Sequence, residues 1–380
     1  MKKPKIALAH EFLNTIGGAE QVLIQLHHTF PDAPIYTLTS NPNFISQYLP
    51  NAKIITSSLK YLPSWLTNHH QIFLLYFPIA TELFDFSDFD ILISDSNSFI
   101  KGAITKPGTI HVSYIHSPTR YIWDQTHDWI NQKKLNLFAP IINWRFNQLR
   151  IWDRLAADRV DVMLANSKYV GQRIEKYYRR NPYKVIYPSI DASSFRPPEN
   201  FKKNDYYLVL SRLQHFKRFD LAILACNRLK KRLIVAGDGD AKKHLESLAG
   251  PTIEFLGQVS DAKKIELMQS AKAFIFPGEE DFGIVPVEAM AAGTPVLAYK
   301  TGGLLESVRE NVTGLFFERQ TVDDVVFCIK NFEKNYSRFS AKVCINHAKK
   351  FDHQLFRQEF FNLVEEIYLN KSKFLRPKND

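Results

Sequence analysis

Residues 271–299 read AKAFIFPGEEDFGIVPVEAMAAGTPVLAY and follow the order strand, loop, helix, strand. The apolar run Ala273–Phe276 predicts a buried strand, and Val296–Ala298 predicts the next one. Between them, Pro286 falls in the first turn of the expected helix, where a missing N–H costs nothing, and Gly293 closes that helix. The loop before the helix is therefore expected at the carboxyl edge of a parallel sheet, where open α/β sheets bind ligands.

The end of this loop offers backbone N–H groups to a ligand. Those of Phe282, Gly283 and Ile284 are expected to face the crevice, and with the helix dipole they favour an anion or a sugar hydroxyl. Two glutamates bracket the loop at a spacing of eight, Glu280 on the loop and Glu288 in the expected first helical turn. A carboxylate is a bidentate acceptor suited to vicinal sugar hydroxyls. Outside this string, such a pair would more simply be a helix cap and a solvated side chain.

Short apolar runs alternate with helical patterns over the whole chain, which predicts an α/β fold of buried parallel strands in βαβ units. Proline interrupts regular structure near Pro188–Asp191, so we place a hinge there. We predict two doubly wound, Rossmann-like domains, residues 1–188 and 189–351, followed by a C-terminal helix and tail, residues 352–380. The other expected strands are Ile6–His10, Ile91–Ser94, Val112–Ile115, Val162–Ala165, Val185–Tyr187, Tyr207–Leu210, Leu233–Ala236 and Ile253–Leu256.

The composition is that of a globular protein of about two domains. The chain has 380 residues, 45% hydrophobic and 23% charged, with a formal charge of +10, which excludes a disordered or collagen-like chain. Its three cysteines are scattered and form no CxxC pair, which argues against a disulfide framework or zinc knuckle and favours a reducing compartment. The longest apolar run, Ile72–Ala80, is far shorter than the roughly 20 residues of a membrane span. We expect a cytoplasmic protein, soluble or peripheral on the inner face of the plasma membrane.

The string E-x-F-G-x-x-x-x-E-A-M-A-x-G-x-P-V, from Glu280 to Val296, resembles the signature of retaining glycosyltransferases of family 4, which have the GT-B fold. The chain departs from the family's usual Glu-Gly, because Asp281 follows the first glutamate. In the family, the first glutamate holds the donor sugar and the second holds the nucleotide ribose, which the resemblance implies for Glu280 and Glu288. It also implies that the two domains face a cleft and that the C-terminal helix crosses back to the first domain.

Basic and glycine residues elsewhere extend the resemblance. Arg212 and Lys217 follow the first strand expected in the second domain. The forked guanidinium of an arginine and the ammonium group of a lysine can together bind a diphosphate. The family's R-x4-K neutralises the leaving nucleoside diphosphate, whereas the pair alone would be a basic surface loop. Gly17 and Gly18 follow the first strand and match the family's G-G-A-E, which lies against the donor diphosphate. Thr301–Gly303 is another landmark of the family.

The string HSPTRY, residues 116–121, follows the expected strand Val112–Ile115. His116 matches a family histidine that contacts the donor sugar and the reacting centre, although a lone histidine is more often structural. The resemblance assigns Arg120 to the acceptor or the donor sugar. The string narrows the resemblance to a subgroup that includes mannosyltransferases of O-antigen and exopolysaccharide assembly.

The resemblance implies a retaining, metal-independent enzyme that moves a hexose, with GDP-mannose as the expected donor. The expected acceptor is a glycan or lipid-linked saccharide in cell-surface polysaccharide synthesis. Arg212, Lys217 and backbone N–H groups would stabilise the leaving diphosphate, so no cofactor is expected, and neither D-x-D string, residues 88–90 and 238–240, is expected to hold a metal. A nucleotide-sugar 2-epimerase shares this architecture, but the glutamate pair and HSPTRY argue against it. The charge would also suit a non-catalytic nucleic-acid-binding protein, but no nucleic-acid module is evident.

Two acid-free segments predict attachment to an anionic membrane surface. No Asp or Glu occurs from Ala33 to Thr81 or from Trp129 to Trp152, and the helix expected after Ser167 is basic. Basic groups near such a surface are worth about 1 kcal/mol each, and aromatic side chains suit the interface. The alternative is a core role for the aromatic residues and solvated lysines. The residues concerned are Tyr48, Lys53, Lys60, Tyr61, Trp65, Phe73, Tyr76, Phe77, Lys133, Lys134, Phe138, Trp144, Arg145, Phe146, Arg150, Lys168, Arg173, Lys176, Arg179 and Arg180.

Overall fold

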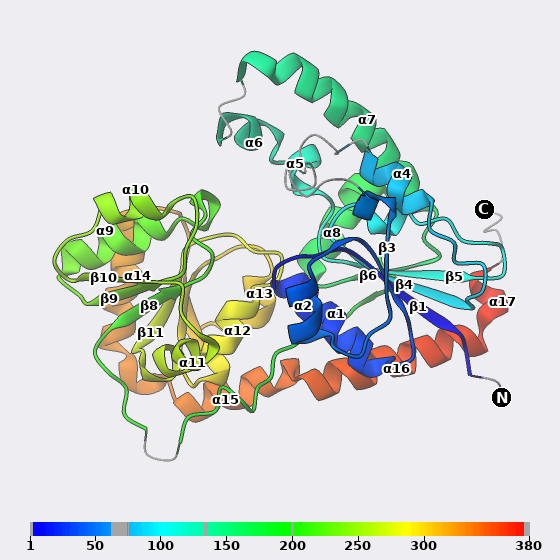
Figure 1. The fold of residues 1–380 in the computed structure, drawn as a ribbon. Helices are drawn as coiled ribbons and strands as arrows, with labels where there is room; N and C mark the ends of the chain where they lie inside the picture. The colour runs from blue at the N-terminus through cyan, green and yellow to red at the C-terminus, as the bar shows by residue number, and fades with distance from the viewer. Residues whose placement is uncertain (1–2, 62–73, 75, 133–135, 199–200, 376–380) are drawn as a thin grey trace. The chain divides into compact units, whose positions relative to one another are not determined.

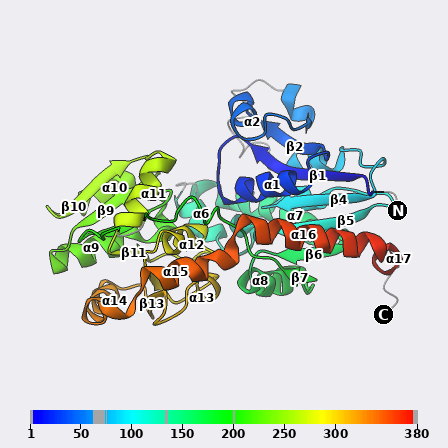
Figure 2. The same ribbon diagram turned by 90° about the horizontal axis from the view of Figure 1, so that it is seen from below.

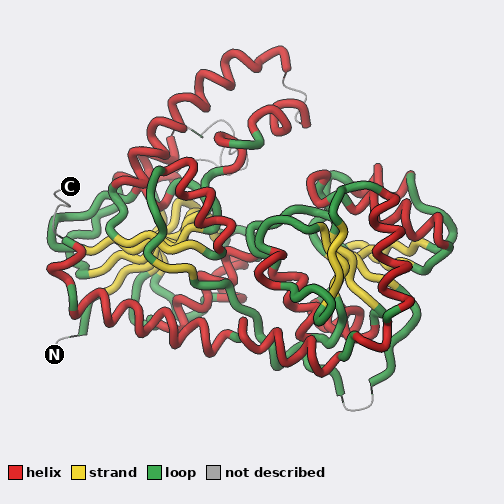
Figure 3. The backbone as a smooth tube through the Cα atoms, turned by 180° about the vertical axis from the view of Figure 1, so that it is seen from behind, coloured by secondary structure: helices red, strands yellow, loops and turns green. Residues whose placement is uncertain are grey.

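The computed structural model describes residues 3–61, 74, 76–132, 136–198 and 201–375, which form two compact units. The first unit runs to Tyr187 and takes up the chain again from Phe356, and the second is Pro188–Leu355. The chain therefore divides one residue before the expected end of the first domain. Each unit is a parallel sheet with helices on both faces, the doubly wound arrangement that the sequence predicts (Figures 1 and 3).

Seven parallel strands form the sheet of the first unit. They are β1 (Ile6–Leu13), β2 (Ile35–Ser40), β3 (Ile54–Thr56), β4 (Ile91–Ser96), β5 (Ile110–Ile115), β6 (Val162–Ala165) and β7 (Lys184–Val185). Their order in the sheet is β3-β2-β1-β4-β5-β6-β7. β4 and β5 are buried along their whole length, as expected of strands covered on both faces. The sequence patterns above do not predict β2 and β3, and β7 is shorter than expected.

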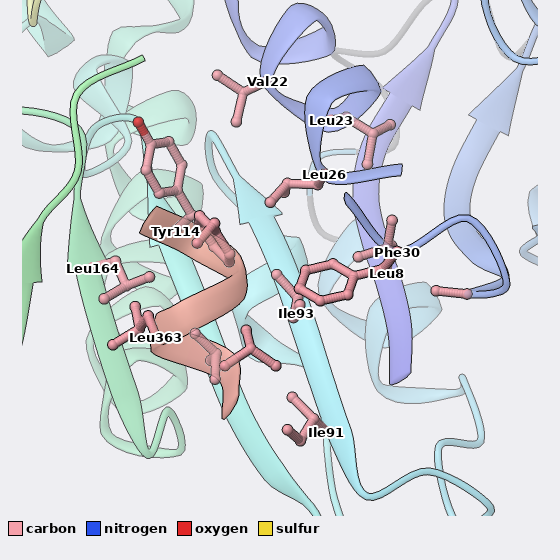
Figure 4. Close-up of a cluster of buried hydrophobic side chains, with 14 of the residues drawn as sticks. Leu8, Val22, Leu23, Leu26, Phe30, Ile91, Ile93, Tyr114, Leu164 and Leu363 are labelled. Carbon is pink, nitrogen blue, oxygen red and sulfur yellow. The ribbon is translucent and has the colours of Figure 1, made fainter. Parts of the chain in front are cut away.

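Helices of the first unit cover both faces of this sheet. They are α1 (Gly18–Thr29), α2 (Pro42–Tyr48), α4 (Tyr76–Glu82), α5 (Arg120–Trp123), α6 (Thr126–Gln132), α7 (Ala139–Asp158), α8 (Lys168–Tyr178), α16 (His353–Leu369) and α17 (Lys371–Phe374). α1 and α16 lie on the same face (Figure 2). Phe356, Phe360 and Leu363 of α16 are buried at helical spacing, in one cluster with Tyr114 of β5 and Leu26 of α1 (Figure 4). The C-terminal helix thus returns to the first unit, as the resemblance implies.

The inner side of α7 is fixed to the opposite face of the sheet. Phe146 is buried in a cluster there. Asp153, also buried, forms an ion pair with Lys101 and accepts hydrogen bonds from Trp123 Nε1 at 2.7 Å and the Tyr178 hydroxyl at 2.9 Å. α7 is therefore held by both apolar and polar contacts.

Six parallel strands form the sheet of the second unit. They are β8 (Tyr207–Leu210), β9 (Leu233–Ala236), β10 (Ile253–Gly257), β11 (Ala273–Phe276), β12 (Val296–Tyr299) and β13 (Gly314–Phe317), in the order β10-β9-β8-β11-β12-β13. β13 is not predicted from the sequence. The helices are α9 (Phe219–Leu229), α10 (Lys242–Ser247), α11 (Asp261–Ser270), α12 (Ile284–Ala291), α13 (Leu304–Ser307), α14 (Val322–Lys334) and α15 (Ala341–Ala348). Both sheets begin with the strand order of the Rossmann fold.

Among the helices of the described residues, none combines the length and the hydropathy that crossing a bilayer requires.

Candidate active site

Each sheet has one point at which its strand order reverses, between β1 and β4 in the first unit and between β8 and β11 in the second. Open α/β sheets bind ligands at such a switch point, beyond the carboxyl ends of the strands. The loops that leave β8 and β11 carry the residues predicted to bind the donor in the second unit. The loops that leave β1 and β5 carry the predicted residues of the first unit.

Lys217 and Glu280 meet at the switch point of the second unit. Lys217 ends the 3-10 helix η4 (His215–Lys217), which follows β8, and Glu280 lies on the loop after β11. Lys217 Nζ is 2.6 Å from Glu280 Oε1 and 5.5 Å from the centroid of the Phe276 ring. A cation and a carboxylate are thus fixed side by side at the sheet edge. Such a pair can bind a phosphate and a hydroxyl of the same ligand.

Two glycines allow a neighbouring loop to pack directly against the loop that carries Glu280. Gly302 has a φ of +59°, and a Cβ there would stand 2.4 Å from the carbonyl oxygen of Glu280. A Cβ on Gly303 would stand 2.3 Å from the carbonyl oxygen of Asp281. The Gly303 N–H instead donates to the Glu280 carbonyl at 2.9 Å. The string Thr301–Gly303 therefore holds Glu280 in place.

The same loop enters α12 through Gly283, whose φ of +88° lies in the left-handed region that favours glycine. Phe282 is buried and meets Phe351 edge to face, with ring centroids 5.3 Å apart. The first N–H groups of a helix have no acceptor within the helix. Gly283 and Ile284 thus offer donors at the start of α12, as the sequence predicts for this loop.

Glu288 is buried on α12. The helix begins at Ile284, so Glu288 lies in its second turn, and the prediction that it lies in the first turn is wrong. Its Oε1 accepts a hydrogen bond from Lys264 Nζ of α11 at 2.7 Å, whereas its Oε2 meets no donor among the described residues. Burial raises the pKa of Glu288, and the charge of Lys264 opposes this rise. A buried carboxylate oxygen without a protein donor is suited to accept from a ligand hydroxyl.

Arg212 is exposed on the loop that leaves β8. Two glycines allow the loop after β9 to pack against this loop. A Cβ on Gly237 would stand 1.9 Å from the carbonyl oxygen of Ser211, and one on Gly239 would stand 2.4 Å from that of Leu213. These contacts give both glycines a packing role. A pocket of about 250 Å³ opens beside the two loops, lined by Gln214, His215, Arg218, Phe219, Asp220, Ala241, His244 and Leu245.

In the first unit, His10, Asp95 and His116 form a chain at the switch point. Asp95 of β4 lies opposite His10 of β1 in the sheet register, and His116 directly follows β5. His116 Nε2 is 2.6 Å from Asp95 Oδ1, and His10 Nδ1 is 2.9 Å from Asp95 Oδ2 and 3.1 Å from the Asp95 carbonyl oxygen. Asp95 and His10 are fully buried, and His116 retains 9% of its exposure. The buried carboxylate therefore orients the histidine that reaches the surface.

The contacts among His10, Asp95 and His116 stabilise opposite charges on His10 and Asp95. Burial acts to lower the pKa of His10, but hydrogen bonds and charges from Asp95 and Glu20 raise it well above 6.5. Burial acts to raise the pKa of Asp95, but His116 and His10 hold it below 3.8. An ion pair thus lies beneath the sheet edge at neutral pH.

Gly17 and Gly18 begin α1, with Gly17 as the extended residue before the helix and Gly18 as its first residue. A Cβ on Gly17 would stand 2.8 Å from Glu20 Oε2, and Glu20 Oε1 is 3.4 Å from His10 Nε2. The string GGAE therefore links the start of α1 to His10 and, through it, to Asp95. Arg120 is the first residue of α5 and lies half-buried.

Sequence reasoning missed His10, Asp95 and Lys264. His10 and Asp95 interrupt apolar runs that are otherwise typical of buried strands, and this signal is visible in the sequence. Lys264 gives no such signal, because a lysine on a helix is ordinarily solvated. Its partner Glu288 lies 24 positions away.

Two family models match the chain in succession. The model described as Glycosyltransferase Family 4 matches residues 16–194, and the model described as Glycosyl transferases group 1 matches residues 191–351. Together they extend over both units. The chain belongs to glycosyltransferase family 4. It is a GT-B glycosyltransferase, as the resemblance in the sequence predicts.

Relatives of this glycosyltransferase include alpha-1,3/1,6-mannosyltransferases. Human ALG2 is 29% identical over 248 residues, which are 54% of this chain and 59% of ALG2. The chain thus spans less than two thirds of the human relative. ALG2 of Kluyveromyces lactis is 25% identical over 447 aligned positions, which cover 96% of this chain and 85% of that protein.

Solved structures share the fold of this glycosyltransferase over nearly its whole length. Anabaena HepE in complex with UDP and glucose has a TM-score of 0.70 and 19% identity, covering 96% of this chain and 100% of HepE. Sucrose-phosphate synthase from Thermosynechococcus elongatus has a TM-score of 0.72 and 16% identity, covering 96% of this chain and 99% of that one. These likenesses establish the GT-B architecture.

Proposed function

We propose that the enzyme transfers mannose from GDP-mannose with retention of the anomeric configuration. The observation that carries the transfer of a hexose from a nucleotide sugar is the group formed by Lys217, Glu280, Glu288 and the N–H groups at the start of α12, which we call the donor cradle. A diphosphate, a hexose and a ribose each find the chemistry they require there. The mannosyltransferases among the relatives support mannose as the transferred sugar.

Each group of the donor cradle, and Arg212 on the loop after β8, has a distinct part in this proposal. Lys217, Arg212 and the N–H groups of Gly283 and Ile284 would neutralise the charge that develops on the leaving diphosphate, which lowers the barrier to bond cleavage. Glu288 Oε2 would accept from a ribose hydroxyl, since it meets no donor among the described residues. Glu280 would accept from a hydroxyl of the hexose while it keeps Lys217 oriented.

Retention follows if the acceptor hydroxyl attacks from the face that the diphosphate leaves. The bond between the acceptor oxygen and the anomeric carbon forms, the bond from that carbon to the phosphate oxygen breaks, and the phosphate takes the proton. His116, oriented by Asp95, would contact the donor sugar, and Arg120 would contact the acceptor or the sugar. We propose a glycan or lipid-linked saccharide as the acceptor, on the cytoplasmic side of a membrane in surface polysaccharide synthesis.

A UDP-hexose is the second candidate donor, because HepE was solved with UDP and glucose. The donor cradle, as proposed, binds diphosphate, ribose and hexose, which both kinds of donor contain. The two nucleotides differ only in their base. In this proposal, the loops that follow β8 and β9, beside the pocket near Arg212, would contact the base.

Calorimetric titration with GDP-mannose, GDP-glucose, UDP-glucose, GDP and UDP tests the proposal. We expect the GDP compounds to bind at least about tenfold more tightly than the UDP compounds, a difference of about 1.4 kcal/mol. Glu288→Gln should weaken all of them, whereas Glu333→Gln should not, because Glu333 pairs with Lys272 just before β11, at the other end of the strands. Tighter binding of UDP-glucose would overturn GDP-mannose as donor, and no binding of any nucleotide would overturn the transferase site itself.

A further inference from the structure

The structure gives a structural role to several of the residues from which the sequence predicts a membrane-facing surface. Phe77 and Phe146 are buried in the core of the first unit. Arg173 is also buried and forms an ion pair with Asp124. Arg180 donates to the carbonyl oxygens of its own unit. Trp65, Phe73, Lys133 and Lys134 lie outside the described residues.

One apolar surface of the first unit nevertheless remains exposed, along the outer side of α7. Ile141, Trp144, Ile151 and Leu155 each keep between 52% and 60% of their exposure. At about 100° per residue these four side chains fall within about 80° of one another around the helix axis. They extend over about 21 Å at 1.5 Å per residue. We call these four residues the outer stripe.

The residues of the outer stripe are not among the buried residues that hold α7 on its own unit. The buried residues of the helix are Phe146, Leu149, Asp153, Ala156 and Ala157, and they are centred roughly 150° away around the axis. α7 is thus apolar on two opposite sides, of which the sheet covers one. Large exposed apolar surfaces of this kind mark interaction sites in soluble proteins.

The positive charge of Arg145 beside the outer stripe favours an anionic partner, whereas Asp158 offsets the charge of Arg154. Arg145 and Arg154 flank the stripe on its two sides at helical spacing, and Arg145 is exposed. The acidic residues of α7 are Asp153, buried against Lys101, and Asp158, paired with Arg154 at 2.5 Å in the last turn. The exposed side of the helix therefore carries no unpaired carboxylate.

α7 is joined to α4, which carries a further exposed apolar residue. Trp152 Nε1 donates to Glu82 Oε1 at 2.8 Å, which joins the two helices, and Arg159 pairs with the same carboxylate. Ile79 of α4 and Leu83, the residue directly after it, are also exposed.

We infer that the outer stripe docks the enzyme on an anionic lipid surface, with its apolar side chains at the acyl boundary and its arginines among the headgroups. An amphipathic helix with tryptophan on one side and arginine beside it is the kind of helix that lies in a membrane interface. The absence of unpaired acids from the exposed side of α7 favours anionic lipid over a protein groove. The inference rests on the exposed surface of the first unit and does not depend on the identity of the donor.

Flotation with vesicles tests this assignment on the full chain. The protein is mixed with phosphatidylglycerol–phosphatidylcholine vesicles or with phosphatidylcholine vesicles alone, at low and high salt. The test variant is Ile141→Ser/Ile151→Ser, and the matched control is Leu305→Ser/Phe327→Ser, which removes two exposed apolar residues of the second unit, 51% and 72% exposed. Calorimetry with GDP and UDP confirms that each variant is folded and keeps its nucleotide affinity.

We expect the wild-type protein and the control to float with anionic vesicles at low salt, and much less at high salt or with neutral vesicles. The test variant should bind anionic vesicles at least about tenfold more weakly. No flotation of the wild type, equal flotation of the test variant, or equal binding to both vesicle types would overturn the inference. A dimer in size-exclusion chromatography that the test variant abolishes would assign the stripe to a second copy instead. Flotation does not measure nucleotide binding, so the calorimetric test of the proposed function is independent of this one.

Discussion

Replacing Lys217 with Met should weaken nucleoside diphosphate binding strongly while the second unit stays folded. The variant keeps an aliphatic stem over the Phe276 ring but loses the ammonium group 2.6 Å from Glu280 Oε1. A charge-assisted hydrogen bond contributes about 1.5–3 kcal/mol, which is roughly ten- to a hundredfold in Kd. The loss also leaves Glu280 without its cation. Repulsion between that carboxylate and the diphosphate places our expectation at the upper end of the range.

Titration calorimetry with GDP and UDP measures this effect, and Lys272→Met is the matched control. Lys272 is 19% exposed against 13% for Lys217, and its Nζ is 2.7 Å from Asp205 Oδ1. It stands just before β11, at the amino end of the strand, so it should affect stability and leave nucleotide affinity unchanged. Wild-type affinity for both nucleotides in Lys217→Met would refute the reasoning, as would an equal loss in Lys272→Met.

Three further predictions follow from the site. Because burial raises the pKa of Glu288 above 4.5 and the carboxylate is the accepting form, donor affinity measured against pH should fall as the pH drops through a value above 4.5; an unchanged affinity down to pH 4.5 would contradict this. Asp95→Asn should destabilise the first unit by about 3 kcal/mol. The loss of stability should be largest between pH 3.8 and pH 6.5. The lowered pKa of Asp95 contributes stability that is lost in acid, and the raised pKa of His10 contributes stability that is lost in base. Chemical denaturation at several pH values checks this, and Asp323→Asn, which breaks an exposed ion pair, is the control. Transfer should be unaffected by EDTA, and loss of activity that Mg²⁺ restores would refute metal independence.

Most strands that the sequence predicts have continuous apolar runs, whereas the missed strand β2 does not, and the missed β3 and β13 are only three and four residues long. β2 reads IYTLTS, and its threonines interrupt the apolar pattern. Thr37 is nevertheless fully buried, because its hydroxyl donates to the carbonyl oxygen of Glu11 at 3.1 Å. Such a hydrogen bond offsets the cost of burying a polar group, but its partner lies on another strand and cannot be seen from local sequence.

Candidate site residues can be proposed one by one from the sequence, but their partners in the fold cannot. Lys217 and Glu280 follow β8 and β11, which are adjacent in the sheet although two strands separate them in the chain. The corresponding reversal in the first sheet, between β1 and β4, brings His10 and Asp95 together across 85 positions. Strand order is set by how whole βαβ units pack, so motifs predict candidate ligand-binding residues, while the network that holds them is seen only in the folded sheet.

Product analysis by proton NMR tests the central claim most directly. The purified enzyme is incubated with GDP-mannose and a panel of mono- and disaccharides on a hydrophobic aglycone, and the anomeric configuration of the first product is read before any secondary reaction. We expect release of GDP and a new α-mannoside, with the configuration of the donor retained. A β-mannoside would contradict retention. Conversion of GDP-mannose into its 2-epimer without transfer would show that the enzyme is not a glycosyltransferase acting through the donor cradle.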